Sequence, residues 1–279
     1  MRLQRTDRPG RPGFTLIELL VVIGIIVILS TLTIVTIGGV YRYIDQVRTS
    51  AEIRQLADAC EAFKLKYGRY PPSRIVLSET PGGYDANSQL YLGSIFTNID
   101  LSQPIDWNGD GTIQTAPWVL EGDECLVYFL GGPNLQGWCT DKSKPWVATP
   151  GRNREGPFYE FRTDRLVQRR PGFFVYNDRY GRPFLYFAAT ANQTSNNYFA
   201  HCPTSAGNFE PYWDSARSTT SPVANKFYYM ADKFQIISAG EDRNYGTGGP
   251  YNRSNPSAVG PFDRDNLTNF TEGKLHTGR

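Results

Sequence analysis

The chain has 279 residues, with 29 Lys and Arg against 27 Asp and Glu, so its net charge is only +2. This balance gives no indication of a nucleic-acid partner, and the length suffices for one large domain or two small ones with a hydrophobic core. The 17 Tyr, 16 Phe, 27 Gly and 19 Pro are typical of a β-rich, loop-rich globular protein and argue against a disordered chain.

The N-terminus combines a basic segment with a long apolar run. Four arginines precede Gly13, offset by a single acid: Arg2, Arg5, Arg8 and Arg11, with Asp7. Residues 19–40 contain no charge, and about 20 apolar residues are enough to span a bilayer. The positive-inside rule places the arginines in the cytoplasm. We therefore predict a transmembrane helix over residues 14–40, followed by a chain outside the cytoplasm.

Glu18 lies just inside this apolar run. A charged side chain at bilayer depth costs about 2.5–3.5 kcal/mol on insertion scales, and less near the interface. A cleaved secretory signal would be shorter, with its cleavage site after the apolar stretch. An ordinary signal-anchor helix gives no reason for the carboxylate. Pairing with a cation inside the membrane would explain why a carboxylate is present at this position.

Residues 13–18, Gly-Phe-Thr-Leu-Ile-Glu, followed by the apolar run, resemble the leader of type IV pilins and type II secretion pseudopilins. The resemblance implies that a prepilin peptidase removes residues 1–13 by cutting between Gly13 and Phe14, and then methylates the new amine of Phe14. It also implies that Glu18 pairs with the N-terminal amine of a neighbouring subunit during assembly. Such a pair would offset the desolvation of both charges.

The helical pattern continues beyond the apolar run, from residue 41 to 67, without a proline. Apolar residues recur there at steps of three and four and predict one buried stripe: Ile53, Leu56, Cys60, Phe63 and Tyr67. Gly68 is expected to end the helix, and Pro71 and Pro72 prevent its restart. The sequence thus predicts one helix over residues 14–67, half in the membrane and half packed on a sheet.

Residues 68–279 are expected to form one periplasmic globular domain with a loop-rich insertion at 73–172. Within it, residues 125–130 read as a strand, whereas 134–170 and 190–225 read as loops.

Residues 173–176 and 183–188 read as a hairpin around the turn 177–182, and residues 233–238 as a further strand. The predicted fold class is α+β, with the long helix on a small antiparallel sheet and long loops.

Three segments resemble those of major pseudopilins: the helix exit at 68–72, residues 178–186 and residues 234–242. The resemblance implies a pilin-like fold. The long insertion between the helix and the predicted hairpin departs from compact major pseudopilins.

Two acidic segments are candidates for a structural Ca²⁺, a cation that prefers oxygen ligands. Asp106, Asn108 and Asp110 match the first half of a calcium loop, but the closing position is Pro117. Glu121 and Asp123 are substitutes if the chain folds back. A surface turn is the alternative.

The second segment follows the last predicted strand and contains Asp242, Asn244, Asp263 and Asp265, with Asn266 beside them. The corresponding loop of major pseudopilins holds calcium, so the resemblance implies a site here. The alternative is a solvated acidic loop.

The four cysteines permit three pairings, and one between Cys125 and Cys139 would close a short loop. Cys60, on the helical stripe, is expected to be a buried thiol. His201 and Cys202 are adjacent, but no third group orients them, so we expect no enzymatic activity.

The expected function is that of a structural subunit of a type II secretion pseudopilus, assembled from the inner membrane to drive protein secretion. The resemblance implies these partners: other copies of the chain, the prepilin peptidase, an assembly platform with its ATPase, and membrane lipid. Two alternatives stay open, a type IV pilin for adhesion or motility and a membrane-anchored periplasmic binding protein or enzyme.

Overall fold

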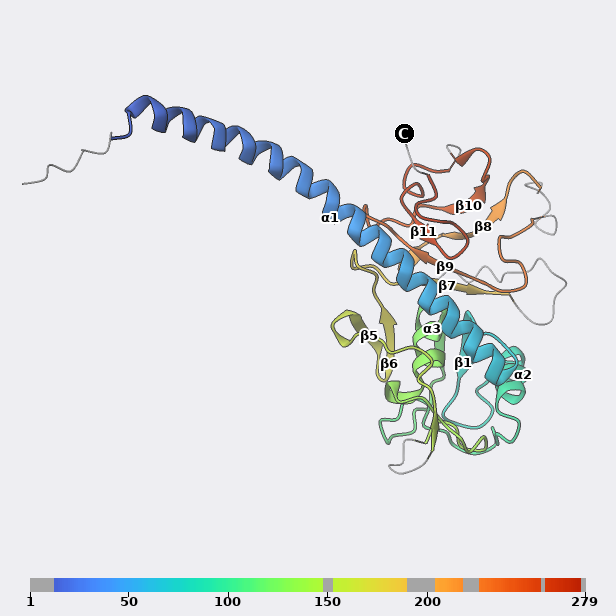
Figure 1. Ribbon diagram of the computed structural model, residues 1–279. Helices are drawn as coiled ribbons and strands as arrows, with labels where there is room; N and C mark the ends of the chain where they lie inside the picture. Colours follow the sequence, from blue (N-terminus) through green and yellow to red (C-terminus); the bar gives the residue numbers. More distant parts are fainter. Residues whose placement is uncertain (1–12, 148–152, 190–203, 218–225, 257–258, 277–279) are drawn as a thin grey trace, which may run out of the picture. The chain divides into compact units, whose positions relative to one another are not determined.

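The computed structural model describes residues 13–147, 153–189, 204–217, 226–256 and 259–276, without the side chains of 32–39. The arginines of the leader and the His201–Cys202 pair lie outside the described residues. The chain divides into two units, Met1–Ile44 and Asp45–Arg279. The fold is α+β, with one long N-terminal helix and several small, mostly antiparallel sheets (Figure 1).

Helix α1 runs from Leu16 to Tyr67 and ends where the sequence predicts. Gly68 has a φ of 77°, a left-handed conformation that glycine adopts without steric cost, and its N–H donates to the Lys64 carbonyl at 2.7 Å. The predicted stripe is confirmed, because all five of its side chains are buried. The C-terminal part of α1 therefore forms one side of the core of the second unit.

Residues 122–131 form helix α3 (Gly122–Gly131), so the strand predicted over residues 125–130 is wrong. Glu121 and Glu124 form a capping box at the helix N-terminus, which provides partners for backbone N–H groups that the first turn leaves free. All ten residues of the helix are buried. A helix buried on every side shows no polar face, and a short apolar run of this kind cannot be told from a buried strand by periodicity.

Both strands of the hairpin predicted from residues 173–176 and 183–188 are present, but the pairing predicted between them is wrong. Strand β6 (Phe173–Tyr176) pairs with β5 (Leu166–Arg170), across a turn that contains Gly172 with a φ of 76°. Strand β7 (Leu185–Ala188) pairs with β9 (Phe234–Ser238) instead. The two sides of the predicted turn are joined by one isolated bridge, Asn177 to Pro183, and by the Phe184 N–H, which donates to the Tyr176 carbonyl at 2.9 Å. Pro183 has no N–H with which to extend a ladder.

Strand β9 confirms the strand predicted at residues 233–238, and lies between β7 and β11 (Leu267–Thr268) in an antiparallel sheet. The other sheets are two-stranded, and the β5–β6 pair is described above. The others are β1 (Arg74–Leu77) with β2 (Trp118–Glu121), β3 (Trp138–Cys139) with β4 (Arg154–Glu155), and β8 (Glu210–Asp214) with β10 (Gly248–Tyr251), the last pair parallel. The remaining helices are α2 (Ala86–Ile95) and the short turns Pro133–Leu135, Thr163–Arg165 and Thr204–Ala206.

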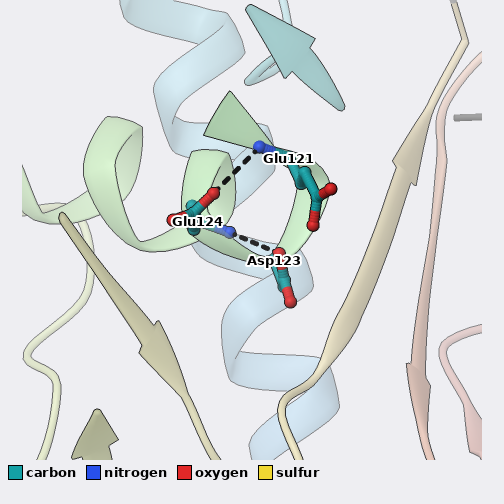
Figure 2. Close-up of side chains that lie close together, drawn as sticks. All are labelled: Glu121, Asp123 and Glu124. Carbon is teal, nitrogen blue, oxygen red and sulfur yellow. Dashed lines mark hydrogen bonds between the residues drawn. The ribbon is translucent and has the colours of Figure 1, made fainter. Parts of the chain in front are cut away.

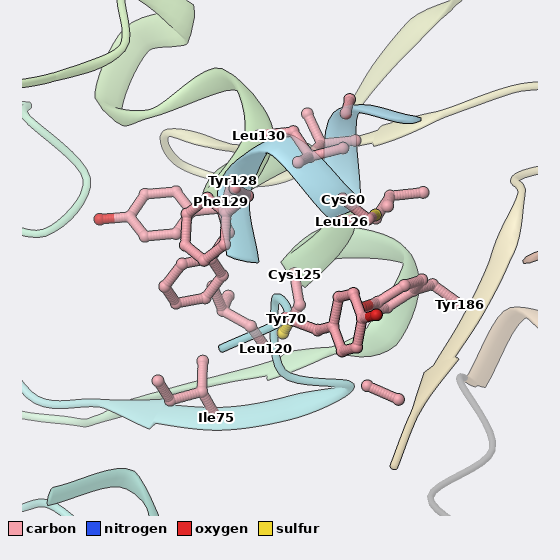
Figure 3. Packing of buried hydrophobic residues seen from close by; sticks show 14 of the residues in the cluster. Cys60, Tyr70, Ile75, Leu120, Cys125, Leu126, Tyr128, Phe129, Leu130 and Tyr186 are labelled. Carbon is pink, nitrogen blue, oxygen red and sulfur yellow. The ribbon is translucent and has the colours of Figure 1, made fainter. Parts of the chain in front are cut away.

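Residues 73–172 are part of the main core rather than a loop-rich insertion added to it. The core cluster that contains Phe63 of α1 and Phe234 of β9 also contains Ile75, Trp107 and Phe129. Figure 3 shows side chains of α3 packed between those of α1 and β1. The segments 134–170 and 190–225, predicted as loops, also include strands, β5 in the first and β8 in the second.

Candidate functional site

The first turn of α1 is closed by a reciprocal contact between Thr15 and Glu18. The Thr15 N–H and hydroxyl each donate to Glu18 Oε2 at 2.8 Å, and the Glu18 N–H donates to the Thr15 hydroxyl at 3.3 Å. This is a capping box, which satisfies N–H groups that a helix start leaves without partners. Glu18 is thus held at the helix N-terminus, immediately after the predicted cleavage point between Gly13 and Phe14.

The apolar side chains that follow are exposed in the monomer. Phe14 is 82% exposed, and every large apolar residue from Leu16 to Leu29 is at least 45% exposed. Because these residues are nearly consecutive, they point to all sides of the helix. A continuous apolar surface of this kind marks contact with lipid or with other protein chains.

Among the residues that the structure describes, no helix is at once long and apolar enough to cross a membrane. The transmembrane assignment of residues 14–40 stays a prediction.

Glu52, which no sequence pattern singled out, connects α1 to the globular part. Glu52 is 7% exposed and forms an ion pair with Arg165. It also accepts hydrogen bonds from the hydroxyls of Tyr176 at 2.7 Å and Tyr159 at 3.3 Å. Burial and the adjacent Glu52 carboxylate raise the pKa of Tyr176 to about 12. The sequence feature that could have predicted this role is the position of Glu52 beside Ile53, on the apolar side of the helix.

Of the four residues proposed as the C-terminal calcium site, Asp242, Asp263 and Asp265 lie near one another, whereas Asn244 Oδ1 accepts from the Gly246 N–H at 3.0 Å. Asp263 is buried and accepts from the Tyr212 hydroxyl and the Gly248 N–H, both at 2.8 Å. Asp265 accepts from the N–H of Asp242 at 2.9 Å. Burial raises the pKa of both Asp242 and Asp263, and the charges of Asp265 and Asp263 raise that of Asp242 further.

Oxygen atoms are therefore concentrated here, and one of them lacks a partner. Asn266 is fully buried, and its Oδ1 has no hydrogen-bond partner among the described residues. Its Nδ2 donates to the Tyr212 hydroxyl and the Tyr245 carbonyl, both at 2.8 Å. Within the described part of the chain, however, Asp242, Asp263 and Asp265 do not form a group of three ligand atoms within 4.8 Å of one another.

The Asp106 loop has the hydrogen bonds of a self-contained turn. The Asp106 carboxylate accepts from the N–H groups of Gly109 at 2.7 Å and Gly111 at 2.9 Å. Asn108 Oδ1 accepts from the N–H of Asp110 at 3.1 Å. The loop's own backbone thus uses oxygens that a cation would need.

Glu121 and Asp123, considered above as closing ligands, belong to a different cluster with Glu124. Figure 2 shows their carboxylates around the start of α3, and one oxygen of each lies within 4.8 Å of the others. Two arginines of β5 offset most of this charge. Arg169 binds Asp123 at 2.7 Å and Glu121 at 3.2 Å, and Arg170 binds Glu124. The cluster is an ion-pair network that fastens α3 to β5.

The cysteines are not paired as proposed. Cys125 and Cys139 are both buried free thiols, so the disulfide between them is a wrong prediction. Cys125 points into the core from α3 (Figure 3), whereas Cys139 lies in β3 beside β4. Cys60 is a fully buried free thiol, as predicted.

Residues 8–34 match the family model described as the prokaryotic N-terminal methylation motif. The match covers Gly13, Phe14 and Glu18, together with much of the exposed apolar helix. No curated protein and no solved structure matches the chain. The chain therefore carries a type IV pilin-like prepilin signal, the substrate of a prepilin peptidase, and this supports the pilin and pseudopilin class.

Proposed function

We propose that this chain is a structural subunit of a type II secretion pseudopilus. The observation that carries the proposal is the position of the methylation motif, directly before a helix whose apolar side chains are exposed on all sides. Cleavage after Gly13 would leave this helix with Phe14 at its start. A helix of this kind is suited to store a subunit in lipid and then to form the core of a filament.

The precursor would lie in the inner membrane, with its leader in the cytoplasm and its globular part in the periplasm. The four leader arginines support this orientation. Lipid would cover the apolar part of α1 until an assembly platform and its ATPase extract the subunit. In the filament, copies of the same helix would replace the lipid.

Glu18 has two roles in this account. In the monomer it caps α1 through Thr15. In the filament its carboxylate would pair with the methylated amine of Phe14 of a neighbouring subunit, because cleavage creates a cation in the same apolar layer. A glutamine retains the capping hydrogen bonds but carries no charge. The two roles can therefore be separated by substitution.

The resemblance of residues 178–186 and 234–242 to segments of major pseudopilins favours a pseudopilin. These segments supply the Asp178 turn and the central strand β9, and the Ser238 hydroxyl donates to Asp178 at 2.6 Å. An extracellular type IV pilin is the alternative that the same N-terminal signal fits.

Calcium binding at the C-terminal loop is part of this proposal. The carboxylates of Asp242, Asp263 and Asp265 and the unpartnered Oδ1 of Asn266 are hard oxygen donors that suit Ca²⁺. When bound, the ion would neutralise the mutual repulsion of the carboxylates. The Asp106 loop is the weaker candidate, because its backbone N–H groups already occupy both carboxylate oxygens of Asp106.

The experiment that tests the proposed function compares Glu18→Gln with Glu18→Ala in cells that express the assembly system. We expect both variants to be cleaved and neither to enter filaments. Normal filaments from Glu18→Gln would show that capping, and not charge pairing, is what Glu18 contributes.

A further inference from the structure

A shallow groove of about 520 Å³ lies between α1 and residues 158–160. Asp58 and Ala62 line it from the helix, and Phe158, Tyr159 and Glu160 line it from the other side. All of these residues belong to the second unit. Buried Ala59 of the core also lines it, so the groove lies at the edge of the core.

Contacts of both aromatic residues fix segment 158–160 on the helix. The Phe158 N–H donates to the Leu130 carbonyl at 2.8 Å, and its ring lies 5.4 Å from the ring of Phe63. The Tyr159 hydroxyl donates to Glu52 of α1 at 3.3 Å. Because both walls are held by core contacts, the groove is present before any partner binds.

The groove is negatively charged and partly aromatic. Asp58 and Glu160 are exposed, and neither makes a hydrogen bond or ion pair within the described residues. Carboxylates bind a guanidinium through charge-assisted hydrogen bonds, and an aromatic ring attracts the same cation through its face. The chemistry thus favours an arginine, whose planar head satisfies both kinds of contact.

Helix α1 also carries exposed arginines that could bind such a groove. Arg48 and Arg54 are exposed and make no ion pair in the described part of the chain. Exposed Ala51 lies between them, and a small residue lets another chain approach closely. Each copy of the chain therefore carries both an acidic groove and exposed arginines on α1.

We propose that the groove of one subunit binds an exposed arginine of α1, Arg48 or Arg54, from a second copy of the chain. The proposal rests on the proposed function, since filament assembly is what brings two such helices together. Arg54 and Arg48 precede Asp58 by four and ten residues. At 1.5 Å per residue, an axial shift of roughly 6 or 15 Å between parallel helices brings one of them level with Asp58 of the neighbour.

Two chains with one introduced cysteine each test this contact. A full-length Asp58→Cys chain and a longer, tagged Arg54→Cys or Arg48→Cys chain are expressed together with the assembly system. Oxidation of the filament fraction should give a mixed dimer with one of the two arginine variants. A disulfide forms only when the Cα atoms are within about 7 Å. In the control, Asp232→Cys replaces Asp58→Cys. Asp232 is exposed and lies outside the groove, so this chain should give no mixed dimer with either arginine variant.

Charge reversal gives a second readout on the same filaments. Asp58→Arg combined with Glu160→Arg should lower filament yield about fivefold or more, in line with the loss of exposed ion pairs, whereas Asp232→Arg should leave it unchanged. Adding Arg48→Glu and Arg54→Glu to the Asp58→Arg, Glu160→Arg chain should restore the filament yield, because opposite charges then face each other again. Equal protease resistance of the detergent-solubilised full chains shows that the variants fold.

Filaments that form normally, with no mixed dimer from either arginine position and no effect of charge reversal, would overturn the groove contact and leave the proposed function intact. A wild-type chain that keeps Met1 and forms no filaments would overturn both.

Discussion

Thr15 and Glu18 form a closed unit at the start of α1, in which the Thr15 N–H and hydroxyl both donate to the same carboxylate oxygen at 2.8 Å. The predicted cut between Gly13 and Phe14 leaves one residue before Thr15, so processing would place a new cationic amine in the same apolar layer as a carboxylate that already has hydrogen-bond partners. The capping box gives Glu18 a structural role within one chain. Substitutions must therefore distinguish this role from a contact between chains.

The first prediction concerns helix capping. Glu18→Ala should remove both hydrogen bonds from Thr15 and fray the first turn, which costs about 0.5–2 kcal/mol for loss of a cap, whereas Glu18→Gln should retain them. Amide hydrogen exchange at residues 16–20 of the full chain in detergent measures the difference. Equal exchange in the two variants would show that the capping box is absent in solution.

The second prediction concerns the anchor of α1 on the globular part. Glu52→Leu leaves Arg165, whose side chain is only 14% exposed, without its counter-ion. Removal of one partner from a buried ion pair costs about 3–5 kcal/mol, so the urea midpoint of the full chain in detergent should fall sharply. Asp164→Asn is the matched control, because its ion pair with Arg162 is about 60% exposed on both sides and should contribute less than about 1 kcal/mol. Similar small losses in both variants would contradict a structural role of Glu52.

The third prediction concerns calcium. In the chelated full chain, millimolar Ca²⁺ should raise the melting temperature by at least about 2 °C, because a ligand that binds only the folded state stabilises it. Asp242→Asn should abolish the rise and Asp110→Asn should not. The reverse pattern would assign the ion to the Asp106 loop, and no rise in the wild-type chain would exclude both sites.

The fourth prediction concerns pH. Burial raises the pKa of the Asp263 carboxyl above its ordinary value of 3.8, although the Tyr212 hydroxyl and two backbone N–H groups oppose this rise. Between 3.8 and the raised pKa the folded chain binds more protons than the unfolded chain, so its stability falls as pH rises through that window. In calcium-free buffer, Asp263→Asn should make the slope of melting temperature against pH less negative above about pH 4. An unchanged slope would show that Asp263 does not titrate in this range.

Local signals in the sequence were sufficient for several elements. The end of α1 follows from Tyr67, Gly68 and the prolines after them, and strand β9 follows from its β-branched and apolar run. Helix α3 could not be predicted in this way, because its burial on all sides removes the polar face that marks a surface helix. Strand pairing also failed, because the turn after Tyr176 directs β7 to a partner about 50 residues further along the chain.

Some residues of the candidate site could also be predicted from local sequence, whereas others depend on the fold. The predicted processing residues Gly13 and Phe14 and the predicted assembly residue Glu18 lie within one short motif, so a local pattern in the sequence was enough to predict them. The groove brings Asp58 together with Glu160, about 100 residues apart, through tertiary packing that no local pattern encodes. The Glu52–Arg165 ion pair likewise depends on the fold.

The central claim is that this chain is processed as a prepilin and enters a filament through the new N-terminus. Mass spectrometry of the chain purified from membranes tests it most directly. The account predicts a mature N-terminus that begins with N-methylated Phe14. A chain that retains Met1, or one cut at a different residue, would contradict it.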